Sequence, residues 1–158
     1  MNTRRARAAQ PVVDSGLDAT DWAILRELQI EARLSFKELS RRVHLSAPAV
    51  GERVRRLESS GVLSGYHAHI DAARAGRAIA AMIRMTCYGP RCLLRDPTVA
   101  EWAEVLEIHR ITGDACCLLK VATTSMPALE GLLDRLASYG QPCSTMILDS
   151  PAPWSPLR

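Results

Sequence analysis

Aromatic residues are scarce in this sequence of 158 residues, which contains one Phe, three Tyr and three Trp. A hydrophobic core must therefore be built from Leu, Ile, Val and Ala, and the hydrophobic content of 47% is ordinary for a globular protein. No run of about 20 apolar residues occurs, so we expect no membrane span. Residues 1–13 contain arginines but no apolar signal-peptide centre, so we expect a cytoplasmic protein.

Cysteines are few, odd in number and not arranged as CxxC, which argues against a disulfide framework and a zinc motif. Cys116 and Cys117 are adjacent on an expected strand, so they should point to opposite faces. Buried small side chains are the favoured interpretation, and a redox or metal role is the alternative. A metal pair at His67 and His69 is a weaker alternative, because no third ligand is nearby. We expect no cofactor and no metal. The five cysteines are Cys87, Cys92, Cys116, Cys117 and Cys143.

The net charge of +3 is concentrated in the N-terminal part of the chain. Residues 1–61 hold eleven basic and eight acidic residues, whereas residues 62–158 hold nine of each. Seven basic and two acidic residues lie between Arg33 and Arg56, which predicts a local basic surface. Residues 1–16 are polar and Arg-rich, and we expect a flexible tail that either touches DNA phosphates or remains solvated.

Three helices with readable starts are expected in residues 17–62. The first should run over residues 18–30 with Asp18 as its cap. Ser35-Phe36-Lys37-Glu38 is an S-x-x-E capping box, and the second helix should end near residue 43. Ser46 should cap the third helix, whose buried stripe is Val50, Val54 and Leu57. Gly61 should end it in a left-handed conformation.

Only residues 44–46 separate the second and third helices, a spacing typical of a helix-turn-helix unit. Small residues on the third helix would let it enter a major groove, and its arginines would reach phosphates or guanine edges. We expect contacts from Arg53 and Arg56 in particular. The alternatives are a solvated charged helix, and an Arg53 that braces the bundle through a carboxylate. The predicted DNA-binding residues are Ser35, Ser46, Ala47, Pro48, Ala49, Gly51, Glu52, Arg53, Arg55 and Arg56.

The second half predicts strands and helices in the order β-α-β-β-α-β. Strands are expected at 77–87, 105–112, 115–122 and 143–148, with Gly113-Asp114 as a tight turn. A short helix should span 96–103, and a Ser125-capped helix should end at Gly140. Residues 63–76 read as a hinge strand or linker, residues 77–150 as one domain, and residues 151–158 as an irregular tail. Such a domain leaves one sheet face open, which a second subunit would cover.

The sequence resembles the leucine-responsive regulator/AsnC (Lrp/AsnC, feast/famine) family over about residues 17–149. The motifs are Leu17-Asp18, Arg33-Leu34-Ser35, the run Arg53-Val54-Arg55-Arg56-Leu57-Glu58, and Ile111-Thr112-Gly113-Asp114. The resemblance implies an α+β protein with a winged-type helix-turn-helix and a ferredoxin-like domain with an antiparallel sheet. It also implies a transcriptional regulator that binds double-stranded DNA, forms homodimers or octamers, and responds to a small-molecule effector, usually an amino acid.

The resemblance also places the effector beside the turn between the second and third strands, at a subunit interface. Gly113 allows close backbone approach, turn N–H groups could hold a carboxylate, and Asp114 could hold an ammonium group. Many family members have Tyr-Asp where this chain has Ala115-Cys116, which leaves room for an apolar, aromatic or sulfur-containing amino acid. A plain hairpin turn is the alternative. The predicted effector residues are Thr112, Gly113, Asp114, Ala115, Cys116 and Thr145.

Two other functions are compatible with parts of the sequence. Proteins of similar architecture act as sirohaem-type decarboxylases, and His109 and Arg110 could line such a pocket. No nucleophile–base pair stands out, so we do not expect an enzyme. An effector-binding module that works through partners is the third possibility, and the arginines of the third helix disfavour it.

Overall fold

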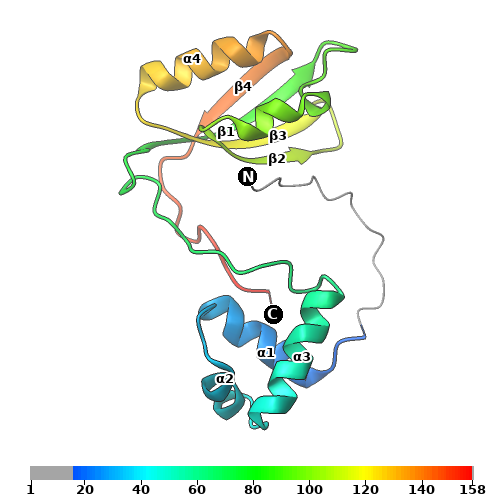
Figure 1. Cartoon of the computed structure of the whole chain (residues 1–158). Helices are drawn as coiled ribbons and strands as arrows, with labels where there is room; N and C mark the ends of the chain where they lie inside the picture. The colour runs from blue at the N-terminus through cyan, green and yellow to red at the C-terminus, as the bar shows by residue number, and fades with distance from the viewer. Residues whose placement is uncertain (1–15, 158) are drawn as a thin grey trace. The chain divides into compact units, whose positions relative to one another are not determined.

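The computed structural model describes residues 16–157, so the expected tail of residues 1–16 lies almost wholly outside the described part. The chain divides into two compact units, Met1–Ala68 with Trp154–Arg158, and His69–Pro153. The first unit contains helices and the second a four-stranded sheet, as can be followed in Figure 1. No helix in residues 16–157 is long and apolar enough to cross a membrane.

The helices of the first unit begin at the predicted polar caps. They are α1 (Ala19–Ile30), α2 (Phe36–Arg42) and α3 (Ala47–Ser59). Asp18 accepts the Asp21 N–H at 2.8 Å, and the Asp21 carboxylate accepts the Asp18 N–H at 3.2 Å. Ser35 and Ser46 each accept the N–H three residues on. The reciprocal half of the predicted Ser35 box is absent, because the Glu38 carboxylate pairs with Arg41 and Arg42 instead.

A small aliphatic core joins the three helices, and it contains the predicted stripe of α3. The turn before α3 is tight, with His44 in the left-handed region at φ 55°. Gly61 ends the helix as predicted, at φ 73°, and the Leu63 N–H bonds the Leu57 carbonyl at 2.9 Å. The buried residues are Ile24, Leu25, Leu28, Leu39, Val50, Val54 and Leu57.

The expected hinge strand is not formed in residues 63–76, and no strand wing accompanies the helix-turn-helix in the described part of the first unit. An extended segment needs a second strand for its N–H and C=O groups, and this single chain offers none there. Residues 72–76 form a turn instead, in which the Arg77 N–H bonds the Ala72 carbonyl at 2.7 Å and Gly76 has φ 86°. The C-terminal tail is irregular as expected, and the Leu157 N–H donates to the Gln29 side chain at 2.7 Å.

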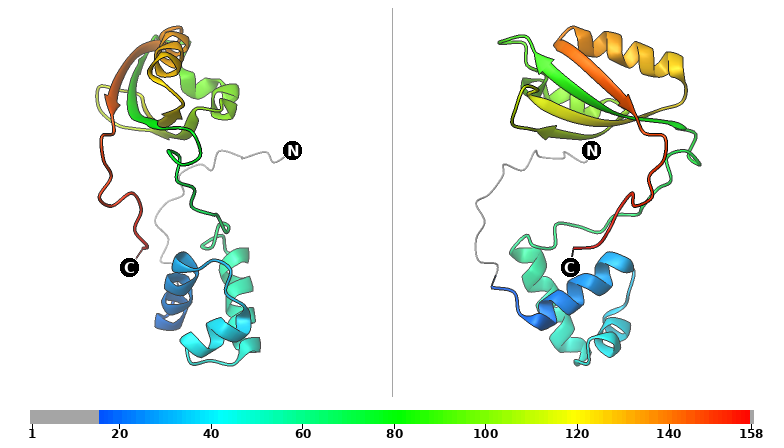
Figure 2. Two further views of the ribbon diagram at one scale, coloured as in Figure 1. Left: turned by 90° about the vertical axis from the view of Figure 1, so that its left-hand side faces the viewer. Right: turned by 180° about the vertical axis from the view of Figure 1, so that it is seen from behind.

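The second unit is an antiparallel sheet of β1 (Ile79–Cys87), β2 (Val105–Arg110), β3 (Cys117–Thr123) and β4 (Gly140–Met146), in the order β2-β3-β1-β4. Helix α4 (Met126–Ala137) and two 3-10 helices, η1 (Leu93–Arg95) and η2 (Pro97–Glu101), lie on one side of it (Figure 2). The short helix predicted at 96–103 is present as the 3-10 helix η2, which begins after the Asp96 cap and ends two residues before the predicted end, and η1 precedes it in the chain. Asp96 accepts the Thr98 N–H at the start of η2.

Alternating residues of the strands separate a packed face from an open one. Residues 81, 83 and 85 of β1 and the odd-numbered residues of β3 are buried beneath α4 and the 3-10 helices, as the strand period requires, and Ile79 and Cys87 at the ends of β1 are half-buried. Met82, Leu118 and Thr145 lie on the other face, where Met82 is opposite Thr145 in the β1–β4 register. The core residues are Ala81, Ile83, Met85, Leu93, Val99, Cys117, Leu119, Val121, Leu129, Leu132 and Leu136.

Two turn predictions in this unit are wrong. The β2–β3 connection is a six-residue loop, 111–116, rather than a two-residue turn, because the last pair of the ladder is Arg110 with Cys117. Gly140 does not end α4, since Ser138 caps that helix and Gly140 is the first residue of β4. Gly140 lies opposite Cys87, and a methyl group on it would overlap the Thr86 carbonyl oxygen and lie 2.7 Å from Cys87 Cα. Glycine is therefore required where β4 meets β1.

We predict that Gly140→Ala lowers the free energy of unfolding by about 1–3 kcal/mol, because the methyl group meets rigid backbone. Gly131→Ala is the matched control, since Gly131 is exposed within α4 and its added methyl group would meet no atom within 4 Å. That change should raise the free energy of unfolding by up to about 1 kcal/mol. Urea unfolding followed by circular dichroism measures both, and an unaltered Gly140→Ala would contradict the close approach.

Candidate DNA-binding and effector interfaces

The predicted DNA-binding residues fall on two faces of α3 and at the starts of α2 and α3. Pro48, Glu52 and Arg55 are exposed and spaced i, i+4, i+7, so they share one face. Ala49, Arg53 and Arg56 form a neighbouring face. Ser35 and Ser46 are exposed caps, and Ala47 is half-buried.

Gly51 is buried, so its expected place on the exposed face is wrong. A Cβ added at Gly51 would lie 3.4 Å from the Phe36 ring, in ordinary van der Waals contact. Gly51 therefore faces the start of α2 rather than an outside surface, and the packing there has room for a methyl group.

The face of Arg53 and Arg56 is turned to a carboxylate of α1. Asp21 is fully buried, and its two oxygens accept Arg53 Nη1 at 2.9 Å and Arg56 Nη2 at 2.6 Å. Arg53 Nη1 also lies 2.6 Å from Asp18 Oδ2. This hydrogen bond from Arg53, followed by that from the Asp21 N–H, holds the pKa of Asp18 below its usual value. The alternative in which Arg53 braces the bundle through a carboxylate is confirmed.

The buried role of Asp21 is not among the predictions made from the sequence. The spacing of Asp21 indicates that it is buried, since Asp21, Leu25 and Leu28 lie at i, i+4 and i+7 and share the apolar face of α1. A carboxylate on such a face needs cationic partners. Arg53 and Arg56 are the nearest arginines of the packed helix.

The remaining basic side chains divide into paired and unpaired groups. Arg42 joins α2 to α1 through Glu27 and Glu31, both at 3.0 Å. The hydrogen bonds that Arg42 donates to Glu27 and then Glu31 raise the pKa of Arg42. Among residues 16–68, four exposed Arg and Lys side chains make no ion pair or hydrogen bond with any residue of 16–157: those of Arg26, Arg33, Lys37 and Arg55. Arg33 and Lys37 were absent from the predicted set, although their charge lay inside the basic stretch.

The predicted effector residues are not gathered into one place by a single chain. Loop 111–116 is closed by the Ile111 N–H to the Cys116 carbonyl at 3.3 Å, and Gly113 has φ 103°. Thr112, Gly113 and Asp114 are exposed, whereas Ala115 and Cys116 are half-buried. The Cys116 N–H bonds Met85, but Thr145 pairs with Met82, about 10 Å along the strand.

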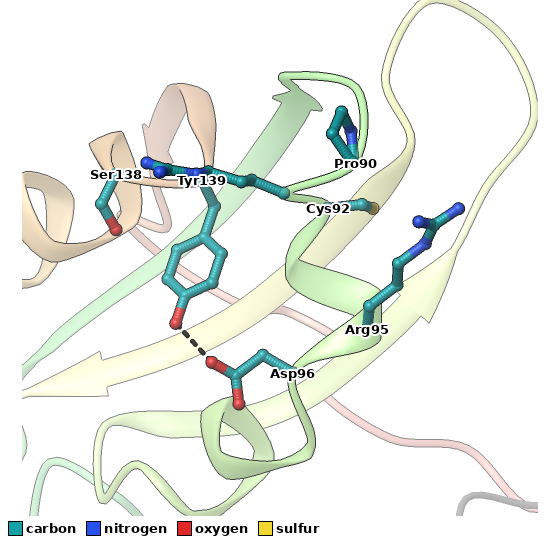
Figure 3. Close-up of a pocket in the computed structure, with 7 residues that line it drawn as sticks. Pro90, Cys92, Arg95, Asp96, Ser138 and Tyr139 are labelled. Atoms are coloured by element: carbon teal, nitrogen blue, oxygen red, sulfur yellow. Dashed lines mark hydrogen bonds between the residues drawn. The ribbon is translucent and has the colours of Figure 1, made fainter.

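The residues of the enzyme alternative do not line a cavity together. His109 is an exposed residue of β2, and its Nε2 lies 2.9 Å from Glu107 Oε2. Hydrogen bonding to His109, ahead of that to Lys120, keeps the pKa of Glu107 low. A pocket of about 360 Å³ lies elsewhere, beside Tyr139 and Asp96, whose side chains are joined at 2.6 Å (Figure 3). Neither His109 nor Arg110 lines it.

The exposed histidines of the linker also gain no metal site. Among residues 16–157, one group of three potential metal ligands occurs, and it contains neither His67 nor His69. That group consists of cysteines, and it lies in the second unit.

Residues 17–58 match the AsnC-type helix-turn-helix domain, and residues 97–150 match the Lrp/AsnC ligand binding domain. The transcriptional regulator LrpB of Bacillus subtilis is 35% identical over 126 residues, which cover 78% of this chain and 83% of LrpB. The chain belongs to the Lrp/AsnC family of transcriptional regulators. The family predicted from the motifs is thereby confirmed.

Solved structures agree with this assignment. LrpC of B. subtilis superimposes with a TM-score of 0.83 and 30% identity, over 87% of this chain and 99% of LrpC. A transcriptional regulator of Neisseria meningitidis in complex with L-methionine gives a TM-score of 0.83 and 31% identity, over 90% of this chain and 96% of that one. The α+β architecture, a helix-turn-helix followed by a ferredoxin-like ligand-binding domain, is thus shared with known regulators.

We predict that the Asp18–Arg53 ion pair makes stability depend on acid. Because the pKa of Asp18 is lowered by folding, its contribution is complete above the unfolded value of about 4 and is lost as the pH falls through the lower folded value. Asp18→Asn keeps a good helix cap but removes the titrating carboxylate. Below about pH 5 its free energy of unfolding should therefore decrease less steeply with falling pH than that of the wild type.

Urea unfolding across a pH series tests this. Asp134→Asn, on the exposed face of α4, is the control, since its side chain has no partner among residues 16–157. Parallel stability curves for wild type and Asp18→Asn would show that the pair does not contribute.

Proposed function

We propose that this regulator binds specific double-stranded DNA by placing α3 in the major groove. The observation that carries the proposal is the face of Pro48, Glu52 and Arg55, which is exposed and has no charge partner among the described residues. Ala47, Pro48 and Ala49 are small enough for close approach at the helix start. Arg55 contacts phosphate or a guanine edge, and Glu52 can accept from a cytosine amino group.

The structure supports different roles for the other predicted residues. Arg53 positions α3 through Asp18 and Asp21, and Arg56, whose side chain is 57% exposed, keeps N–H groups for a phosphate. The hydroxyls of Ser35 and Ser46 lie at exposed helix starts, where phosphates are favoured. Arg33 and Lys37 add unpaired positive charge beside them.

A homodimer formed through the open sheet face fits the arrangement of the second unit. Met82 and Leu118 are half-buried on that face, which no helix of the described chain covers. A twofold dimer would present two α3 helices to a pseudo-palindrome, with half-sites about one helical turn apart. Further assembly to an octamer, and a cytoplasmic location, complete this proposal.

The effector is proposed to be an apolar, aromatic or sulfur-containing amino acid bound at loop 111–116. The L-methionine complex of the Neisseria regulator supports this class. Asp114, whose carboxylate has no partner in residues 16–157, would hold the ammonium group, and loop N–H groups would hold the carboxylate. Because Thr145 is distant within one chain, its hydroxyl would be supplied by another subunit. A non-enzymatic regulator is proposed, which is supported by relatives and solved structures that are named as transcriptional regulators.

We predict that Arg55→Ala weakens binding to a duplex selected from a random library. Loss of a base contact should cost about 1–3 kcal/mol, and loss of a phosphate contact should reduce the salt slope by about one. Arg26→Ala, an exposed and unpaired arginine of α1, is the control and should bind normally. Fluorescence anisotropy over a salt series distinguishes the cases. Unchanged affinity and slope for Arg55→Ala would exclude this face of α3.

We predict that Gly113→Asp weakens effector binding about tenfold or more, because a side chain at φ 103° strains the loop and its charge repels the ligand carboxylate. Gly76→Asp is the control, since Gly76 also has a positive φ and open space but lies outside the loop. Calorimetry with the twenty amino acids measures both. Equal binding by wild type and Gly113→Asp would place the effector elsewhere.

A further inference from the structure

Three cysteine sulfurs meet where β1 ends and loop 111–116 returns to the sheet. Cys87 Sγ lies 2.8 Å from Cys116 Sγ and 3.2 Å from Cys92 Sγ. All three sulfurs lie within 4.8 Å of one another, and all three residues are half-buried. They come from the end of β1, the loop before η1 and the end of loop 111–116. We call them the thiol cluster.

The backbone fixes the thiol cluster from several sides. The Cys87 N–H donates to Cys116 Sγ at 3.2 Å, and Cys116 N–H bonds the Met85 carbonyl at 2.8 Å. Gly140 lies opposite Cys87 and has no room for a side chain, so the backbone of β4 packs closely against Cys87 as well. Ordinary core cysteines scatter among aliphatic side chains, whereas here the sulfurs are one another's nearest polar neighbours.

Solvent and positive charge adjoin the thiol cluster. Cys92 lines the pocket of about 360 Å³ together with Arg91 and Arg95. In Figure 3 the Cys92 sulfur points away from the Tyr139 ring, toward the side on which the Arg95 side chain lies. A cation therefore has an entry path, and the arginines offset the negative charge of three thiolates.

We propose that Cys87, Cys92 and Cys116 bind one thiophilic d10 cation, such as Cu⁺ or Zn²⁺, through three thiolates. Three sulfurs at about 2.3 Å from one ion would lie about 3.8–4.0 Å apart, so small rotations of the present side chains suffice. No other His, Cys, Asp or Glu of residues 16–157 joins the group, which suits a trigonal ion or one that keeps a water. Each thiol loses its proton to solvent on binding, and no electron is transferred.

The cation would act on the loop that the proposed effector uses. Cys116 is the last residue of loop 111–116, so a bound ion fixes one end of that loop to β1. This consequence rests on the proposed function, whereas the binding of the cation does not.

Cadmium titration of the reduced, metal-free full chain tests the binding. The expected result is ultraviolet thiolate-to-cadmium absorbance that saturates at one Cd²⁺ per chain. Bound Cd²⁺ should also protect Cys87, Cys92 and Cys116 from iodoacetamide, as read by peptide mass spectrometry, while Cys143 is alkylated equally with and without it. Cys143 is exposed on β4 and lies outside the cluster. This measurement needs no variant.

Variants then assign the ligands. Cys92→Ser should weaken Cd²⁺ binding by more than the 10–100-fold typical of an outer-shell change. Cys143→Ser is the matched control and should bind like the wild type. No saturable absorbance, full binding by Cys92→Ser, or equal protection of Cys143 would overturn the proposal. A Cys87–Cys116 disulfide in a protein that takes up no Cd²⁺ after reduction would overturn it as well. Both readouts are independent of DNA and amino-acid binding, so failure here leaves the proposed function standing.

Discussion

A carboxylate without solvent contact, that of Asp21, connects the first and third helices of the helix-turn-helix unit. A buried charge is tolerated only where partners replace its water, and Asp21 has three: Arg53, Arg56 and the Asp18 N–H. The arginines remain partly exposed, so the gain in stability is smaller than that of a fully buried pair. The geometric effect is larger, because two guanidinium groups fix the rotation of α3 about its axis. That rotation decides which face of α3 is presented to a groove.

The starts and ends of the helices could be predicted from the sequence because local chemistry determines them. Asp18, Ser35 and Ser46 each satisfy an N–H of their own first turn, and Gly61 supplies the positive φ that ends α3. Those contacts span a few residues and need no knowledge of the fold. The division of arginines between structure and surface could not be predicted in this way. Arg53 and Arg55 are two residues apart, and only the position of α1, 32 residues earlier in the chain, separates their roles.

In the second unit, too, local patterns in the sequence predict the elements but not the contacts between distant residues. The order of strands and the Ser125-capped helix follow from alternation and capping, and both are observed. The length of loop 111–116 depends on where the β2–β3 pairing ends, at Arg110 and Cys117. The place of Gly140 and the thiol cluster depend on residues far apart in the chain, since Gly140 pairs with Cys87 and Cys116 Sγ contacts Cys87 Sγ from 29 residues away. Cysteines at positions 87, 92 and 116 match no ligand motif, so spacing alone gave no reason to group them. The interpretation of the cysteines as buried small side chains fits Cys117, whereas Cys87, Cys92 and Cys116 are half-buried and Cys143 is exposed.

Loop 111–116 adjoins both proposed ligand sites, that of the amino-acid effector and that of the cation. Cys116 is anchored by its N–H to the Met85 carbonyl at 2.8 Å, but the rest of the loop has only long hydrogen bonds, 3.3 Å from Ile111 to Cys116 and 3.4 Å from Thr86 to Asp114, and Gly113 has open space around it. Few interactions therefore select one conformation of the loop. A ligand that binds one loop conformation more tightly than another can shift the population toward that conformation, to the extent of its difference in affinity for the two. An amino acid would act on the exposed residues 112–114, and a cation on Cys116 at the other end. Under these two proposals both ligands would bias the same short segment, and the factor by which one changes the affinity for the other is reciprocal.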